Sequence, residues 1–89
     1  GGVLFTLADT GMGAALYSVL HDGEWCSTVE LKINYFRPVT QGQLACRSQV
    51  VHRGRSLANL ESTLTVGDQV VAKASGTFAI RRSRAEPAR

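Results

Sequence analysis

Residues 3–20 read VLFTLADTGMGAALYSVL, an apolar stretch that decides the fold. At 100° per residue its larger apolar side chains fall in one sector of a helix, which contains Phe5, Met12, Leu16, Val19 and Leu20. Few polar residues occupy the opposite side, so the pattern predicts a helix buried all round. Gly11 and Gly13 each cost about 1 kcal/mol relative to alanine inside a helix, and we expect them to allow close approach to another backbone.

After this helix the apolar period changes from 3.6 to 2, which predicts strands. The first strand begins near residue 25 and ends at Arg37-Pro38, the second covers 44–52, and Gly67-Asp68 is a turn between the third and the fourth. One face of the third carries Ala58, Leu60, Ser62, Leu64 and Val66, and one face of the fourth carries Val70, Ala72, Ala74, Gly76, Phe78 and Ile80. Short connections predict antiparallel neighbours, so we expect an α+β fold with a buried helix followed by a four-stranded meander.

The charge of the chain is unevenly placed. The 89 residues allow one domain, and they carry 10 Lys and Arg against 7 Asp and Glu. Residues 1–80 hold six of each sign, whereas 81–89, RRSRAEPAR, hold four Arg and one Glu. We therefore predict a neutral domain over 1–80 and a basic solvated tail over 81–89. A neutral body argues against a nucleic-acid groove, whose affinity comes mainly from phosphate neutralisation.

The two cysteines, Cys26 and Cys46, have no His or Cys at ligand spacing. They predict neither a disulfide framework nor a metal site, and we interpret them as small core residues in a reducing, cytoplasmic compartment. The apolar helix is too short and too interrupted to span a membrane. A domain of this size buries only about 60–65% of its unfolded surface, so we expect it to associate with further copies.

Asp9 is the only charged residue between Gly1 and His21, and on the helical wheel it lies between Leu16 and Leu20. A carboxylate on an apolar face loses solvation unless a partner or a proton compensates. One interpretation is a structural acid bonded to a strand or a subunit. The other is catalytic, because the Gly1-Gly2 helix start presents free N–H groups that can hold a carbonyl oxygen gaining negative charge.

Four segments together resemble a known family: GGVLFTLADTGMGAAL (1–16), TVELKINYFRPV (28–39), VHRGRSLA (51–58) and VVAKASGTFAI (70–80). They are similar to the hotdog-fold acyl-CoA thioesterases of the phenylacetate-pathway (PaaI-like) type. The resemblance implies a helix wrapped by a curved antiparallel sheet, assembled as a homodimer or homotetramer. Such relatives carry a first strand and a polar Asn- or His-bearing segment before the double glycine, so we expect a hotdog unit without its first strand.

The resemblance also implies roles for three residues near the thioester. Asp9 matches the catalytic acid, which acts as nucleophile or as base for water. Gly2 matches the backbone donor that polarises the carbonyl. Thr28 stands where relatives carry a Ser or Thr that places the water, contributed from the facing subunit. Strict alternation places Thr28 on the opposite face of the strand from Leu31. The direction of the Thr28 side chain therefore depends on a bend at the start of the strand.

A second set of residues forms a hairpin corner. In relatives of this type the corner lies near the pantetheine and phosphates of CoA, and here it consists of Arg53, Gly54, Arg55 and Ser56. Guanidinium groups and free backbone N–H groups suit phosphate oxygens. From the residues alone, an ordinary polar corner is the alternative.

We therefore expect an acyl-CoA thioesterase that hydrolyses an aryl- or medium-chain thioester without a metal or redox cofactor. The alternative is a non-catalytic hotdog module that binds acyl thioesters or serves assembly only. Hydration or dehydration on the same scaffold is disfavoured because such relatives pair an Asp with a His a few residues on, whereas the first histidine after Asp9 is His21. The sequence leaves the acyl chain and the choice between dimer and tetramer open.

Overall fold

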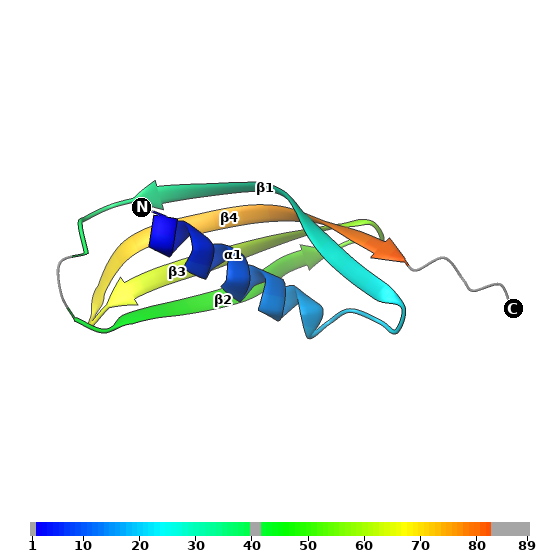
Figure 1. The fold of residues 1–89 in the computed structure, drawn as a ribbon, viewed down its shortest axis with the longest axis horizontal. Helices are drawn as coiled ribbons and strands as arrows, with labels where there is room; N and C mark the ends of the chain where they lie inside the picture. Colours follow the sequence, from blue (N-terminus) through cyan, green and yellow to red (C-terminus); the bar gives the residue numbers. More distant parts are fainter. Residues whose placement is uncertain (1, 40–41, 83–89) are drawn as a thin grey trace, which may run out of the picture.

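The computed structural model describes residues 2–39 and 42–82, which form one helix and one four-stranded sheet (Figure 1). Helix α1 covers Gly2–Tyr17, and strands β1 to β4 cover Glu24–Tyr35, Leu44–Arg53, Leu57–Val66 and Gln69–Arg82. The sheet curves around the helix, which lies across its concave face (Figure 1). The helix and the strand segments therefore agree with the sequence pattern.

The order of the strands differs from the predicted meander. It is β1-β4-β3-β2, with all neighbours antiparallel, so β1 pairs with β4 and not with β2. Only the last three strands follow one another as a meander. The connection over 36–43 is long enough to pass from one edge of the sheet to the other, because eight extended residues span about 26 Å and three strand spacings only about 14 Å.

The helix is buried on one side only. A stripe at four-residue spacing faces the sheet and consists of Leu4, Ala8, Met12 and Leu16. Val3 is 75% exposed and Tyr17 is 72% exposed on other sides. The prediction of burial all round is therefore wrong for the described residues, because the sheet covers one face of the helix. The predicted sector was also displaced, since Phe5 and Val19 are both about two-fifths exposed and the helix ends before Val19.

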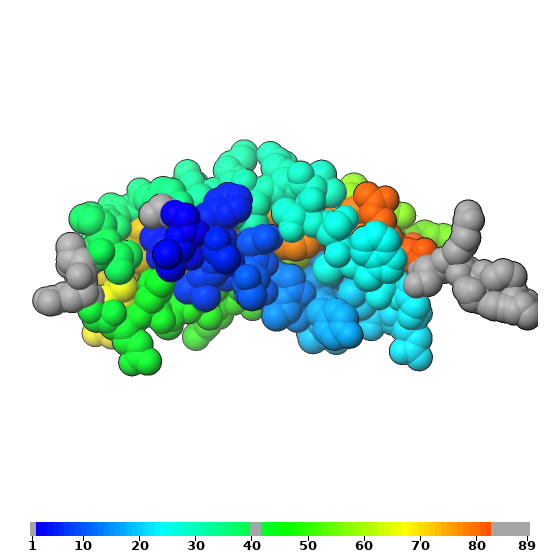
Figure 2. Space-filling model, viewed as in Figure 1, coloured from blue at the N-terminus to red at the C-terminus, as the bar shows by residue number. Residues whose placement is uncertain are grey.

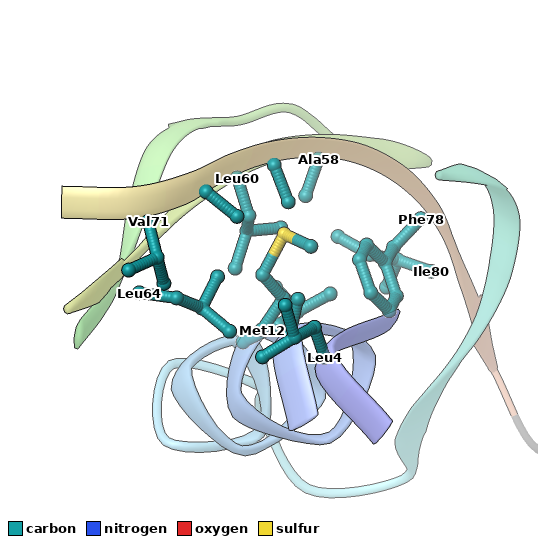
Figure 3. Packing of buried hydrophobic residues seen from close by; sticks show 12 residues of the cluster. Leu4, Met12, Ala58, Leu60, Leu64, Val71, Phe78 and Ile80 are labelled. Atoms are coloured by element: carbon teal, nitrogen blue, oxygen red, sulfur yellow. The ribbon is translucent and has the colours of Figure 1, made fainter. Parts of the chain in front are cut away.

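Met12 occupies the centre of the core, where it points from α1 into the curve of the sheet (Figure 3). A Cβ atom at Gly76 of β4 would lie 3.2 Å from the Met12 Sδ atom, so the glycine leaves room for the thioether. The predicted inner face of β3 is confirmed, and so is that of β4 from Ala72 to Ile80. Val70 was assigned wrongly, because the β3–β4 register shifts between Leu64 and Thr65 and places Val71 in the core instead.

Gly11 and Gly13 differ, although both were expected to allow close approach. A Cβ atom at Gly11 would lie 2.6 Å from the Ser48 Oγ atom and 3.2 Å from the Cys46 Sγ atom of β2. Gly11 therefore brings the helix close to the sheet, against side chains and not backbone. No described atom lies within 4 Å of the corresponding position at Gly13, so the expectation is wrong there.

Two edge strands carry an irregularity in register. The β1–β4 pairing shifts between Thr28 and Glu30, and the β2–β3 pairing shifts between Val50 and His52. Each shift inserts one extra residue, which reverses the alternation of side chains beyond it. Thr28 consequently shares the helix-facing side of β1 with Leu31.

Strand β4 continues to Arg82, two residues beyond the predicted end of the domain. Arg81 pairs with Trp25 and Arg82 with Glu24 of β1. These two arginines therefore belong to the sheet and not to a tail. The rest of the predicted tail, 83–89, lies outside the described residues.

Candidate active site

Asp9 lies at the margin of the buried stripe of α1. It follows the fully buried Ala8 and is itself half-buried. The sheet covers Ala8 and Met12, so the Asp9 carboxylate reaches the boundary between the core and solvent. A carboxylate in this position keeps one side open to a small molecule.

Thr28 of β1 donates a hydrogen bond from its Oγ1 atom to the Asp9 Oδ1 atom over 2.9 Å. The shift at Val29 makes this contact possible because it turns Thr28 toward the helix. The bend at the start of β1 that the role of Thr28 required is therefore present. The contact lies within one chain, whereas the resemblance implies a hydroxyl from the facing subunit. Within the described ranges this is the one hydrogen bond to the Asp9 carboxylate, which therefore retains acceptor capacity.

Cys26 lies on the same side of β1 as Thr28. Burial raises the pKa of the Cys26 thiol, and the negative charge of Asp9 raises this pKa further. The thiol is therefore protonated near neutral pH and is a poor nucleophile. Sequence reasoning treated Cys26 as a core residue and missed its proximity to Asp9, which follows from the reversed alternation at Val29.

Gly2 is the first residue of α1 and is exposed. Apart from the neighbouring residues and the helix backbone, no described atom lies within 4 Å of the position of a Cβ atom there, so no described side chain covers this side of Gly2. Seven residues separate Gly2 from Asp9, which corresponds to about 10 Å along the axis. Helical side chains lean toward the N-terminus, so the carboxylate lies closer to the first turn than its Cα atom does.

A groove of about 620 Å³ opens beside the start of the helix. Its lining is mostly apolar and includes two aromatic rings; the residues are Val3, Leu4, Tyr35, Phe36, Arg37, Pro38, Val39 and Leu44. The end of β1 and the segment that follows it supply the aromatic side. The sequence analysis did not identify this groove, because the groove forms only where the end of β1 lies beside the start of α1.

The hairpin corner at Arg53 to Ser56 forms as predicted, between β2 and β3. The Gly54 N–H donates to the Leu57 carbonyl over 2.8 Å, and the Ile80 N–H donates to the Ser56 carbonyl over 2.8 Å. Arg55 and Ser56 are exposed. The corner lies beyond the C-terminal end of α1, at the opposite end of the helix from Gly2.

Arg53 does not extend into solvent with Arg55. The shift at Val51 turns it inward, where its Nη2 atom forms an ion pair with the Glu24 Oε1 atom. The Glu24 side chain is only 4% exposed and also receives Arg82 Nη2 at 2.9 Å and the His21 backbone N–H at 2.8 Å. The His21 N–H contributes most to lowering the pKa of Glu24, and Arg53 lowers it further against the opposing effect of burial. Sequence reasoning missed this cluster, whose members come from three distant segments.

Among residues 2–39 and 42–82, no group of three His, Cys, Asp or Glu side chains could hold a metal ion. The helix in this part of the chain falls short of the length and apolarity that crossing a bilayer requires.

Comparison with known families accounts for most of the chain. The model of the "Thioesterase superfamily" matches residues 1–75. The chain belongs to the thioesterase superfamily. This match includes α1, β1, β2, β3 and part of β4, and so contains both Asp9 and Thr28.

Solved structures agree with this superfamily assignment. A conserved protein of Pseudomonas aeruginosa is 42% identical, with 91% of this chain and 65% of that chain covered and a TM-score of 0.86. A Bacillus halodurans protein solved with CoA is 32% identical, with 91% and 58% covered and a TM-score of 0.86. A thioesterase-like, phenylacetic acid degradation-related protein of Ralstonia eutropha is 32% identical, with 89% and 60% covered and a TM-score of 0.84. The hotdog fold predicted from the sequence is confirmed.

The superfamily member described here spans 58–65% of the length of these three structures. No curated protein matches the chain.

Proposed function

We propose that the chain is the core of an acyl-CoA thioesterase that hydrolyses the thioester of an aryl- or medium-chain acyl-CoA. The observation that carries the proposal is Asp9, a half-buried carboxylate with one hydroxyl partner, two turns along a helix from an unobstructed start. The kinship with a Bacillus halodurans protein solved with CoA supports the choice of thiol. The phenylacetic acid degradation-related relative supports an aryl group.

The proposed reaction begins with the thioester carbonyl at the start of α1. The Gly2 N–H donates to the carbonyl oxygen as it gains negative charge, helped by the positive end of the helix dipole. Asp9 then either attacks the carbonyl carbon or removes a proton from the water that attacks it. The C–S bond breaks, and CoA leaves as a thiolate that takes up a proton. Thr28 fixes one oxygen of Asp9, which aims the other at the substrate.

The two roles of Asp9 differ in what forms on the enzyme. As nucleophile, Asp9 forms a mixed anhydride with the acyl group, which water then hydrolyses. As base, it forms no covalent bond. A single turnover in ¹⁸O-labelled water that leaves label in Asp9 would establish the nucleophile, because only hydrolysis of an anhydride at the aspartyl carbon puts label there. Neither route uses a metal or a redox cofactor.

The groove beside the helix start is the proposed site for the acyl group. Ligand pockets measure about 300–1,000 Å³ and have apolar and aromatic linings, and this groove of about 620 Å³ falls in that range. Tyr35 and Phe36 would face a planar aryl group from β1 and the segment after it. The charged Arg37 disfavours a long, purely aliphatic chain.

The same proposal includes association of the chain into a homodimer or homotetramer. Val3 and Tyr17 expose large apolar side chains on the helix, and Phe36 is 55% exposed. Burying such surface stabilises a small domain. Light scattering of the purified protein measures the number of copies, and a monomer at micromolar concentration would contradict association. A cytoplasmic location belongs to the same proposal, since Cys26 and Cys46 are free thiols.

The proposal is tested with a panel of aryl-, short-, medium- and long-chain acyl-CoAs and detection of released thiol. We expect turnover of aryl or medium-chain substrates, with little turnover of long chains. Protection against heat by acyl-CoA without thiol release would favour a non-catalytic binding module. Absence of turnover across the whole panel would exclude the proposed activity.

A further inference from the structure

The groove beside the start of α1 combines an apolar lining with a charge. Arg37 is the one charged side chain among the described residues that line it, and the others are apolar or aromatic. Figure 2 shows the start of α1 (dark blue) against the segment that follows β1 (green), and both parts of the chain contribute to the lining. A ligand that fills the groove therefore meets apolar surface along most of its length and a cation at one point.

Arg37 is exposed, but its position is fixed by two hydrogen bonds to β4. Its Nη1 atom donates to the Gln69 Oε1 atom over 2.9 Å, and its backbone N–H donates to the Val71 carbonyl over 3.4 Å. The N–H of the preceding Phe36 donates to the same carbonyl over 2.8 Å. The sheet thus holds both the backbone and the guanidinium. An arginine that is already ordered loses less conformational freedom when it binds a ligand.

The charge of Arg37 is not neutralised within the described part of the chain. No carboxylate of residues 2–39 or 42–82 forms an ion pair with it, because the ion pairs found there all involve Glu24. The bond to Gln69 uses one N–H of the guanidinium, which has five in total. The remaining N–H groups include a fork that fits the two oxygens of a carboxylate. Arg37 can therefore bind an anion without breaking an existing ion pair.

Arg37 lies at the end of the groove that is farther from Asp9. Thr28 of β1 bonds to Asp9. Tyr35, seven residues further along β1, lines the groove together with Val3 at the start of the helix. Strand β1 therefore runs from Asp9 toward the start of the helix, and Arg37 follows two residues beyond its end (Figure 1). An acyl group whose thioester carbonyl lies near Asp9 thus extends toward Arg37.

Asp9 and Arg37 place opposite charges at the two ends of this path. A free carboxylate on the acyl group is repelled by Asp9 and attracted by Arg37, so it fits only with the thioester toward Asp9. We propose that Arg37 selects acyl groups that end in a second carboxylate, an inference that rests on the proposed function. The substrate class is the monothioester of a dicarboxylic acid, with an aryl or a medium-length aliphatic body. Gln69 is a positioning residue that holds the guanidinium.

The test compares pairs of acyl-CoAs that differ only at the end of the acyl group. One pair is suberoyl-CoA and octanoyl-CoA, and the other is 4-carboxybenzoyl-CoA and 4-methylbenzoyl-CoA. The measured quantity is the preference, which is the ratio of kcat/KM for the carboxylated member to kcat/KM for the uncharged member.

Arg37→Gln should lower the preference about fivefold, the effect of losing an exposed ion pair, and should do so mainly through KM of the carboxylated member. Arg37→Glu should lower the preference further, because attraction becomes repulsion. Gln69→Ala should lower it by a smaller factor than Arg37→Gln. Arg47→Gln, which removes an exposed arginine from β2, is the matched control and should leave the preference as it is in the wild type.

A preference that is the same in the wild-type protein and in both Arg37 variants would overturn selection by Arg37 while leaving the hydrolysis in place. Turnover of octanoyl-CoA without turnover of suberoyl-CoA would overturn it as well. Because the uncharged thioester is measured on the same preparation, a general folding defect lowers both activities and does not mimic a change in preference.

If the wild-type protein hydrolyses none of the four thioesters, the proposed function fails, and binding decides the inference. Calorimetric titration with the intact thioesters then replaces the activity assay. Arg37→Gln should weaken the binding of suberoyl-CoA about fivefold more than that of octanoyl-CoA. Equal weakening of the two, or no binding of suberoyl-CoA to the wild-type protein, would overturn the inference.

Discussion

Asp9 and Glu24 are both carboxylates held near the helix, and they are bonded very differently. Asp9 is half-buried and accepts one hydrogen bond, from the Thr28 hydroxyl. The Glu24 side chain is almost completely buried and has two guanidiniums and a backbone N–H around it. A carboxylate with partners on both oxygens stabilises the fold, whereas one with a free oxygen can act on a substrate. The difference supports our proposal that Asp9 carries the chemistry, whereas Glu24 stabilises the fold.

The largest effect expected from this comparison is on turnover. Asp9→Asn should lower kcat by about 10²–10⁴-fold, because an amide cannot act as nucleophile or base. Thermal unfolding should change little, since the amide oxygen still accepts from Thr28. Released thiol and the unfolding temperature are measured on the same preparation. Near-normal turnover would show that Asp9 is neither the nucleophile nor the base.

A smaller loss of turnover is expected when Thr28 is changed. Thr28→Val removes the hydroxyl but keeps the shape of the side chain, and a hydrogen bond to a charged group is worth about 1.5–3 kcal/mol, which corresponds to roughly 10–100-fold. Thr28→Ser is the matched control and should retain most of the activity. Equal kcat values for the Val and Ser variants would contradict a role for the hydroxyl.

The sequence identified Asp9, but it did not show that Thr28 of the same chain donates a hydrogen bond to the Asp9 carboxylate. A lone acid in an apolar helix is visible without a structure, and alternation is regular enough to assign the inner face of β3 and that of β4 from Ala72 onward, although not at Val70. The directions in which the Thr28 and Arg53 side chains point depend on one extra residue in each edge strand, at Val29 and at Val51. Neither position carries a glycine or a proline that would have indicated the irregularity. Glu24 receives partners from β2 and β4, which depends on a strand order that short connections did not predict.

The position of the Asp9 carboxylate depends on how closely α1 packs against the sheet. Gly11→Ala should lower the free energy of unfolding by about 1–3 kcal/mol, since the added methyl group would meet the Ser48 side chain. Gly13→Ala is the matched control. It faces open space and should stabilise the helix by up to about 1 kcal/mol. Chemical denaturation measures both, and equal effects would contradict the close approach at Gly11.

The effect expected for Glu24 is confined to stability and depends on pH. The pKa of Glu24 is lowered from its ordinary value of 4.5, so the stability it contributes is present above that pH and is lost as the pH falls through the lower folded-state value. Glu24→Gln should unfold at a lower temperature than the wild type at pH 7, and the gap should narrow below pH 4.5. Glu61→Gln, at an exposed position on β3, is the control. A gap that does not vary with pH would contradict the ion pairing.

The extra residues at Val29 and Val51 have a consequence for how the sheet meets other chains. Both lie in the edge strands of the described sheet, whose outer N–H and C=O groups are otherwise a template for another strand. An insertion breaks the regular spacing of those groups, so an approaching strand finds two short ladders on β1, 24–28 and 30–35, instead of one long ladder. Such a strand must either stop at the break or carry a matching irregularity. The distortion that turns Thr28 toward Asp9 thus also protects the sheet against indiscriminate aggregation.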